Sequence, residues 1–240
     1  MDLQLNDRVA LLVGGRGTMG QALCRALKGE GAIPVVADLP GPAMPEASAV
    51  VDLDVTQSES VAEAFAQTLR QFGRIDVLVT LAGVYQGGPA AQLSADDWQR
   101  LLAINLTGTF LACREALPIM QRQDYGRIIC VASLAGQVGG VVAGANYSAS
   151  KAGVLSLVKS LARQSEKPWI TVNAISPGPV DGSMTDAWPD EQRDRVRDSI
   201  PLKRFATADE VASLAIFLAS PRAAYIHGAR IDLNGGLFMG

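Results

Sequence analysis

Tyr147 and Lys151 lie four residues apart in a segment, residues 145–165, whose pattern predicts a helix. At that spacing the two side chains share one face of a helix. An ammonium group beside a phenol favours the phenolate, so we expect Lys151 to lower the pKa of Tyr147 from about 10. Such a tyrosine can exchange a proton with a substrate oxygen near neutral pH. A buried tyrosine and a surface lysine on an ordinary amphipathic helix would show the same spacing, so the rest of the chain has to decide.

Short aliphatic runs alternate with longer helical patterns along the chain. Strands are predicted at residues 8–13, 33–37, 49–53, 75–79, 127–132, 170–175 and 229–233. Helices are predicted at 18–28, 58–72, 95–121 (bent near Gly108), 145–165 and 208–219. This alternation predicts an α/β fold, a doubly wound parallel β-sheet of the Rossmann type with helices on both faces, forming a single domain over residues 1–240.

One region stands apart from this alternation. Residues 177–201 are rich in Gly, Pro, Asp and Arg and include Trp188 and a short charged helix pattern. They follow a strand end, where ligands bind in open α/β sheets. We therefore interpret residues 179–201 as a flap over the substrate, with an ordinary surface excursion as the alternative.

A glycine-rich turn follows the first predicted strand. Gly15, Gly17 and Gly20 fit the pattern G-x-G-x-x-G between a strand and a helix, which is the context that the pattern requires. Such a turn lets backbone N–H groups and the helix N-terminus approach a pyrophosphate. The sequence therefore predicts dinucleotide binding here.

Asp38 ends the second predicted strand. A carboxylate at this position accepts hydrogen bonds from the ribose hydroxyls of NAD and repels the 2′-phosphate of NADP. Arg16 could instead meet that phosphate or stack on adenine, but Leu39 offers no second cation. We expect NAD(H) to be favoured over NADP(H).

The composition excludes several classes of function. A net charge of −3 with mixed acids and bases argues against nucleic acid as a partner, and no apolar run is long enough to predict a membrane span. The first residues carry acids and do not resemble a secretory signal. Three cysteines in apolar segments and one histidine, His227, fit no metal site. We expect a cytoplasmic protein without a metal.

Further motifs appear in a fixed order along the chain. Asp54-Val55 follows the third strand, Leu81-Ala82-Gly83 the fourth, and Ser133 ends the fifth. Asn105 lies within the long helical pattern, and Pro177-Gly178-Pro179-Val180 follows the sixth strand. With the Tyr147/Lys151 pair, these motifs resemble the single-domain branch of the short-chain dehydrogenase/reductase family, almost from end to end.

The resemblance implies roles for these residues. Ser133, Tyr147, Lys151 and Asn105 would form the catalytic set, with Tyr147 as proton donor, Ser133 on the substrate oxygen, Lys151 on Tyr147 and the ribose, and Asn105 holding a water. The implied cofactor contacts are Gly14, Arg16, Gly17, Thr18, Met19, Gly20, Asp38, Leu39, Asp54, Val55, Ala82, Gly83, Tyr147, Lys151, Pro177, Gly178 and Val180. Residues expected to line the substrate pocket, because they follow strand ends or lie in the flap, are Val84, Tyr85, Gln86, Leu134, Val141 and Trp188.

The sequence departs from the family pattern around the cofactor. Val13 replaces a threonine, Thr18 a glycine, Thr80 and Leu81 two asparagines, and Gly182 a threonine, with Ser183 as the candidate to restore that last hydroxyl. Gly14, Gly17 and Gly20 fit the spacing of the larger two-domain branch, but the short C-terminal part argues against it.

Taken together, these observations predict an NAD(H)-dependent oxidoreductase that interconverts a secondary alcohol and a ketone. The substrate could be a 3-oxoacyl thioester or a small or cyclic alcohol. Alternatives are a catalytically weak dinucleotide-binding regulatory protein and a dehydratase or epimerase that uses bound NAD. By resemblance, helices 95–121 and 145–165 would pair across a two-fold axis in a homodimer or homotetramer.

Overall fold

A parallel β-sheet of seven strands forms the centre of the molecule in the computed structural model, which describes residues 2–140 and 142–240. The strand order is β3-β2-β1-β4-β5-β6-β7, and every pair of neighbours is parallel. The strands are β1 (Val9–Val13), β2 (Ile33–Asp38), β3 (Ala49–Asp52), β4 (Val77–Thr80), β5 (Gly126–Val131), β6 (Ile170–Pro177) and β7 (Arg230–Leu233). The predicted doubly wound α/β fold in one domain is confirmed.

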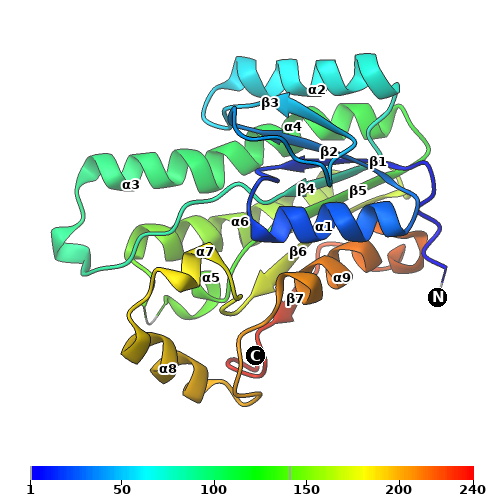
Figure 1. The fold of residues 1–240 in the computed structure, drawn as a ribbon. Coiled ribbons are helices and arrows are strands. Elements are labelled where there is room, and N and C mark those ends of the chain that lie inside the picture. The colour runs from blue at the N-terminus through cyan, green and yellow to red at the C-terminus, as the bar shows by residue number, and fades with distance from the viewer. Residues whose placement is uncertain (1, 141) are drawn as a thin grey trace.

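Helices connect the strands and cover both faces of the sheet (Figure 1). They are α1 (Thr18–Gly29), α2 (Ser58–Phe72), α3 (Ala95–Leu102), α4 (Gly108–Gln121), α5 (Ala135–Val138), α6 (Ala145–Gln164), α7 (Ser183–Asp186), α8 (Asp190–Ser199) and α9 (Ala208–Ala219). Short turns of helix are η1 (Ala90–Gln92), η2 (Ala103–Thr107) and η3 (Pro221–Ala223). Among the described residues, no helix combines the length and apolar character needed to cross a membrane.

Two hydrophobic cores lie on opposite faces of the sheet. One contains buried side chains of α2, α4 and α6, such as Phe65, Cys113 and Val158, and the other contains those of α1 and α9, such as Leu23 and Leu218. Because helices cover both faces, β1, β4, β5 and β6 are buried along their whole length. This explains why β1 is a continuous apolar run and β4 is apolar up to Thr80, whereas β6 also buries polar side chains such as Asn173.

The predicted long helix over residues 95–121 is interrupted before Gly108, at a π-helical turn, η2. The hydroxyl of Thr109 donates to the backbone oxygen of Asn105 at 2.8 Å within this irregular stretch. The wider turn changes the direction in which Asn105 points relative to its neighbours. The prediction of one helix bent at Gly108 was therefore wrong in detail, because the deformation is a π turn centred on Asn105.

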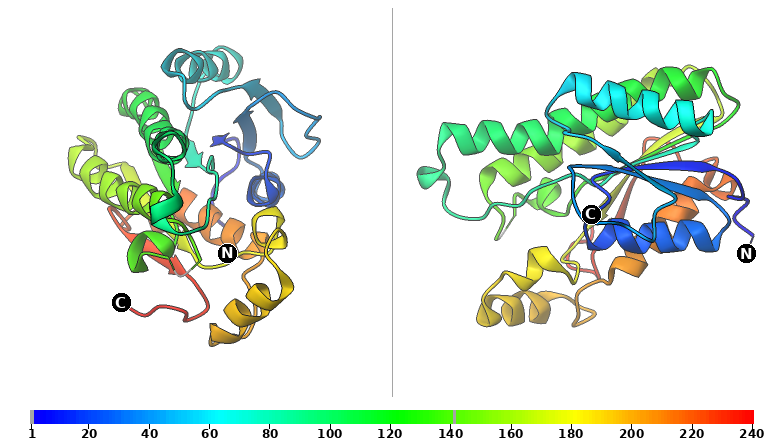
Figure 2. Two further views of the ribbon diagram at one scale, coloured as in Figure 1. Left: turned by 90° about the vertical axis from the view of Figure 1, so that its left-hand side faces the viewer. Right: turned by 45° about the horizontal axis from the view of Figure 1, so that its top comes forward.

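The carboxyl ends of the strands all lie at the same end of the sheet, because all seven strands are parallel. The sheet order changes direction at β1, which lies between β2 and β4, and this creates the crevice in which such folds bind ligands. Figure 2 shows α7 and α8 projecting from the body of the molecule on the side of the loops that follow the strands. A ligand-binding site is therefore expected at the carboxyl ends of the strands.

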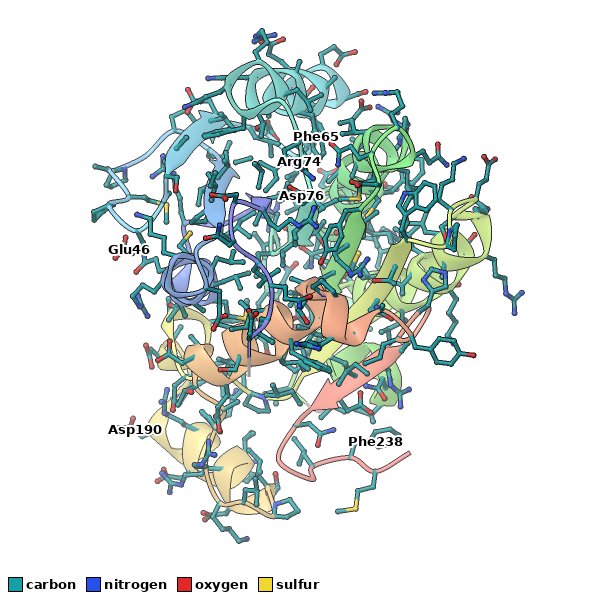
Figure 3. All side chains as sticks on the ribbon, turned by 90° about the vertical axis from the view of Figure 1, so that its right-hand side faces the viewer. Glu46, Phe65, Arg74, Asp76, Asp190 and Phe238 are labelled. Atoms are coloured by element: carbon teal, nitrogen blue, oxygen red, sulfur yellow. The ribbon has the colours of Figure 1, made fainter. Side chains whose placement is uncertain are left out.

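At the amino ends of the strands, Asp76 precedes β4 and is fully buried. Its carboxylate accepts hydrogen bonds from the guanidinium group of Arg8 at 3.0 Å, from Nε of Arg74 at 2.8 Å and from the backbone N–H of Val9 at 2.9 Å. Figure 3 shows Arg74 and Asp76 side by side close to the start of β1. This ion-pair cluster therefore joins the beginnings of two central strands.

Asp76→Asn should lower the free energy of unfolding by about 2–4 kcal/mol, because a charged acceptor of several buried hydrogen bonds is lost. Urea unfolding measures the change. Asp52→Asn, at the exposed end of β3, is the control and should change stability by less than about 0.5 kcal/mol. Equal stability of the two variants would contradict the structural role given to Asp76.

Candidate active site

Tyr147 and Lys151 lie in the first turns of α6, and both are almost fully buried, with 8% and 5% of their surface exposed. Nζ of Lys151 donates a hydrogen bond to the backbone oxygen of Val131, the last residue of β5, at 2.9 Å. Nζ also lies 5.9 Å from the ring centroid of Tyr147. The ammonium group therefore bridges the end of β5 and the tyrosine, as the helical spacing predicts.

Ser133 follows the end of β5, and its hydroxyl lies near enough to the phenol of Tyr147 to lower the pKa of that phenol. The hydroxyl of Ser133 also accepts the backbone N–H of Ala135 at 3.2 Å, which holds the side chain at the start of α5. A Cβ atom on Gly136 would lie 2.6 Å from the backbone carbon of Lys151. Only glycine lets α5 approach α6 this closely, so Gly136 brings the serine to the tyrosine.

The pKa shifts of Tyr147 and Lys151 differ from those expected from their spacing. Burial raises the pKa of Tyr147, and the nearby hydroxyl of Ser133 only partly offsets this effect. Burial also lowers the pKa of Lys151 from 10.5 to about 8. The expectation that Lys151 lowers the tyrosine pKa is wrong for the ligand-free protein, because desolvation of the phenol dominates and the ammonium group donates to Val131 instead.

Asn105 is fully buried at the π turn η2. Its side-chain oxygen accepts the backbone N–H of Val84 at 2.8 Å, and its amide nitrogen donates to the backbone oxygen of Val84 at 3.0 Å and to the hydroxyl of Ser150 at 3.2 Å. A Cβ atom on Gly83 would lie within 3.5 Å of both Asn105 and Lys151. Asn105 therefore fixes the segment after β4 next to Lys151, while the expected water contact stays a prediction.

The glycine-rich turn between β1 and α1 can hold a pyrophosphate. Gly14 has a φ of +81°, and a Cβ atom there would lie 2.3 Å from the backbone of Ala82, so the turn packs directly against the end of β4. Gly17 caps α1 without a side chain, and a Cβ atom on it would meet nothing within 4 Å. The first-turn amides of α1 therefore face open space, which suits an anion.

Asp38 lies beside this turn. One carboxylate oxygen accepts the backbone N–H of Arg16 at 2.9 Å and the other accepts that of Leu39 at 2.8 Å. The guanidinium group of Arg16 donates to the backbone oxygens of Leu39 and Pro42, so it lies over the loop after β2. The carboxylate is fixed by backbone groups and keeps acceptor capacity for ribose hydroxyls.

The remaining cofactor candidates surround the same crevice. The carboxylate of Asp54 accepts the N–H and hydroxyl of Thr56, and Val55 beside it is buried. A Cβ atom on Gly182 would lie 3.0 Å from the hydroxyl of Thr18, so the segment after β6 reaches the start of α1. Other candidates at these strand ends are Met19, Gly20, Gly83, Pro177, Gly178 and Val180.

Departures from the family pattern do not break this arrangement. The backbone oxygen of Val13 accepts the N–H groups of Leu81 at 2.7 Å and of Ala82 at 2.9 Å. The main chain therefore holds β1 and the end of β4 together without the usual side chains at positions 13, 80 and 81. Of the two hydroxyl groups that follow Gly182, that of Ser183 belongs to an exposed residue. The hydroxyl of Thr185 donates to the backbone oxygen of Val180 at 2.8 Å.

Aromatic residues from the expected substrate pocket lie against the catalytic candidate. The ring centroids of Tyr85 and Tyr147 are 5.3 Å apart, and those of Tyr85 and Trp188 are 6.3 Å apart. Gln86 accepts the side-chain amide of Asn146 at 2.7 Å, and the backbone N–H of Leu134 donates to Pro177 at 2.9 Å. Val84, Tyr85, Gln86, Leu134 and Trp188 thus lie around the site, and Val141 lies outside the described residues.

Sequence reasoning missed several residues that shape the site. Ser150, in the same motif as Tyr147, holds Asn105, and Gly136 sets the approach of α5 to α6. Phe205, far along the chain, packs on Trp188 with centroids 6.0 Å apart. Small residues within a motif could have been noticed from spacing, but a contact such as that of Phe205 has no local sequence signal.

Comparisons with known proteins decide the family. A family profile described as "Enoyl-(Acyl carrier protein) reductase" matches residues 15–238. A relative from Aquifex aeolicus, 3-oxoacyl-[acyl-carrier-protein] reductase FabG, is 33% identical over 99% of this chain and 100% of its own length. The chain belongs to the short-chain dehydrogenase/reductase family.

Solved structures of this family agree closely with the fold. A Brucella melitensis short-chain dehydrogenase/reductase described as a glucose/ribitol dehydrogenase has a TM-score of 0.90 at 33% identity and covers 100% of both chains. The Thermoplasma acidophilum aldohexose dehydrogenase has a TM-score of 0.92 at 27% identity and covers 99% of this chain and 96% of its own. This short-chain dehydrogenase/reductase is an oxidoreductase of the alcohol dehydrogenase and ketoreductase class and binds a nicotinamide dinucleotide.

The burial of Lys151 predicts a pH-dependent stability. Its pKa is about 8 in the folded chain and 10.5 ordinarily, so between these values the unfolded chain binds more protons and stability rises with pH. Relative to Lys151→Met, the wild type should gain up to about 3 kcal/mol between pH 8 and 10.5. Urea unfolding of both proteins across this range measures the difference, and a pH-independent difference would contradict burial of the charged lysine.

Proposed function

We propose that this protein is an NAD(H)-dependent enzyme that interconverts secondary alcohols and ketones, with Ser133, Tyr147, Lys151 and Asn105 as its catalytic set. The observation that carries this proposal is the buried phenol of Tyr147, which has the hydroxyl of Ser133 near it and the ammonium group of Lys151 5.9 Å from its ring centroid. This arrangement lies at the strand-end crevice beside a turn suited to a pyrophosphate. Proton donor, oxygen-binding hydroxyl and cofactor cradle are therefore within one site.

The residues present fit a nicotinamide dinucleotide. The first-turn amides of α1 would hold the pyrophosphate, and Asp38 would accept the adenosine ribose hydroxyls. Lys151 would hold the nicotinamide ribose, and the segment from Pro177 to Val180 would flank the nicotinamide ring. When bound, the cofactor supplies or accepts the hydride at the substrate carbon.

The side chains of the site have separate roles in proton transfer, charge stabilisation and positioning. Tyr147 donates its phenolic proton to the carbonyl oxygen during reduction and takes one back during oxidation. Ser133 donates a hydrogen bond to the same oxygen and stabilises the charge that develops on it. Because Lys151 is held by Val131, its ammonium group stays near the tyrosine, where it would hold the ribose of the nicotinamide. Asn105 keeps the segment after β4 in position for Lys151.

Tyr147→Phe should lower kcat by about 10²–10⁴-fold, because the proton donor is removed while the ring is kept. Binding of NADH, measured by fluorescence titration, should change little. Tyr225→Phe, at a fully exposed tyrosine, is the matched control and should leave turnover unchanged. Retained ketone reduction by Tyr147→Phe would refute the acid/base assignment.

The wild type should show a higher kcat/KM with NADH than with NADPH, because the carboxylate of Asp38 repels a 2′-phosphate. In Asp38→Asn the ratio of the two efficiencies should shift toward NADPH by about tenfold or more, whereas exposed Asp96→Asn should not alter it. Steady-state kinetics with both cofactors measure the ratio. A wild type that prefers NADPH would overturn the NAD(H) assignment.

Two further parts of the proposal come from the sequence, the first from composition and position after a strand and the second from resemblance. Residues 179–201 would act as a flap over the substrate, and α4 and α6 would pair with a second copy in a homodimer or homotetramer. The names of the relatives refer both to acyl carrier protein and to sugars, so a 3-oxoacyl thioester and a small or cyclic alcohol are both compatible substrates.

A further inference from the structure

Four aromatic rings form a continuous row from the catalytic candidate into the flap. Tyr147 packs edge-on against Tyr85 with centroids 5.3 Å apart and an interplanar angle of 68°. Tyr85 packs against Trp188 at 6.3 Å, and Trp188 packs edge-on against Phe205 at 6.0 Å. Trp188 is therefore separated from the tyrosine that meets the substrate oxygen by a single ring.

The Tyr85 end of this row is held by the main chain. The hydroxyl of Tyr85 donates to the backbone oxygen of Val142 at 2.8 Å, and burial raises its pKa, so it stays a protonated donor. This hydroxyl is therefore engaged with the protein rather than available to a substrate. Tyr85 is a wall of the site and does not compete with Tyr147 as the proton donor.

The other end of the row is held by Arg193 on α8. Its guanidinium group pairs with Asp181 at 2.7 Å and with Asp186 at 2.9 Å, and it lies 5.1 Å from the ring centroid of Phe205. One side chain thus joins α8, α7 and the loop after β6. These contacts of Arg193 keep Trp188 against Tyr85 in the ligand-free protein.

The indole nitrogen of Trp188 is buried and forms no hydrogen bond with the described residues. A buried N–H group without an acceptor is destabilising, and this one belongs to a half-buried side chain at the proposed substrate site. Trp169 carries a second such nitrogen, but it packs on the core beside α6 with Lys167 over its ring. The indole of Trp188 packs on Tyr85, which in turn packs on Tyr147, and this position makes it a candidate for ligand recognition.

We infer that Trp188 determines substrate specificity by donating its indole N–H to a second oxygen of the substrate, close to the carbonyl that Tyr147 protonates. The inference rests on the proposed ketone reduction and adds the class of ketone. The preferred substrates carry a second oxygen acceptor next to the reacting group and a flat or compact body that packs on Tyr85. A site built to hydrogen-bond a substrate oxygen rejects analogues that lack it, because its donor is then left without a partner.

Two kinds of molecule have this chemistry. A 3-oxoacyl thioester carries a thioester oxygen near its ketone, and a cyclic hydroxyketone carries a hydroxyl group on the neighbouring carbon. Matched pairs of ketones separate them: S-ethyl acetothioacetate against 4-(ethylthio)butan-2-one, and adipoin against cyclohexanone. Within each pair, the first member adds the second oxygen.

The test measures kcat/KM for both pairs with NADH in the wild type, in Trp188→Phe and in Trp169→Phe. Trp188→Phe keeps an aromatic ring between Tyr85 and Phe205 but lacks the N–H donor. We expect the wild type to prefer the oxygenated member of at least one pair, and Trp188→Phe to reduce that preference about tenfold. Trp169→Phe removes an unpartnered indole N–H elsewhere and should keep the wild-type preference.

The pair with the larger effect identifies the source of the second oxygen, an acyl thioester or a cyclic hydroxyketone. A wild type that reduces the plain and oxygenated ketones equally well overturns the inference alone, whether or not the variants fold. An unchanged preference in a folded Trp188→Phe, checked by circular dichroism, does the same. Failure to reduce any of the four ketones with either cofactor overturns the proposed function and the inference together.

Discussion

The hydrogen bond from the buried ammonium group of Lys151 to Val131 is the contact on which the geometry of the site depends. A buried charge needs a partner, and the last backbone oxygen of β5 supplies it. This contact fixes the rotation of α6 relative to the sheet and, through the helix, the position of Tyr147. Ser133 lies just after the same strand, so the end of β5 places the serine, the lysine and the tyrosine together.

Main-chain groups dominate the rest of the site. Asn105 is bound to both backbone groups of Val84, Asp38 is held by backbone N–H groups, and Val13 binds the end of β4 through its carbonyl oxygen. A structure held in this way tolerates side-chain changes better than one held by side-chain pairs. This accounts for the retention of the crevice despite unusual residues at positions 13, 18, 80 and 81.

Several elements could be predicted from local patterns because local physics determines them. The apolar runs of β1, β4 and β5 read directly as strands covered on both faces, and the boundaries of α2 and α9 were predicted to the residue. The π turn at Asn105 could not be predicted, because it depends on contacts that Val84 and Ser150 supply from other elements. The short helices α5 and α7 are too brief to show a helical period and were not predicted either.

The sequence by itself determined the fold class, the family and the chemical types gathered for the site, because spacing within a strand or a helix fixes which side chains share a face. Only the tertiary structure decided the protonation behaviour of Tyr147 and Lys151, since burial acts on the pKa through surroundings that no motif contains. It also decided that Trp188 lies one ring away from Tyr147, backed by Phe205. Such contacts join segments far apart in the chain, and their geometry exists only after the sheet and its loops have formed.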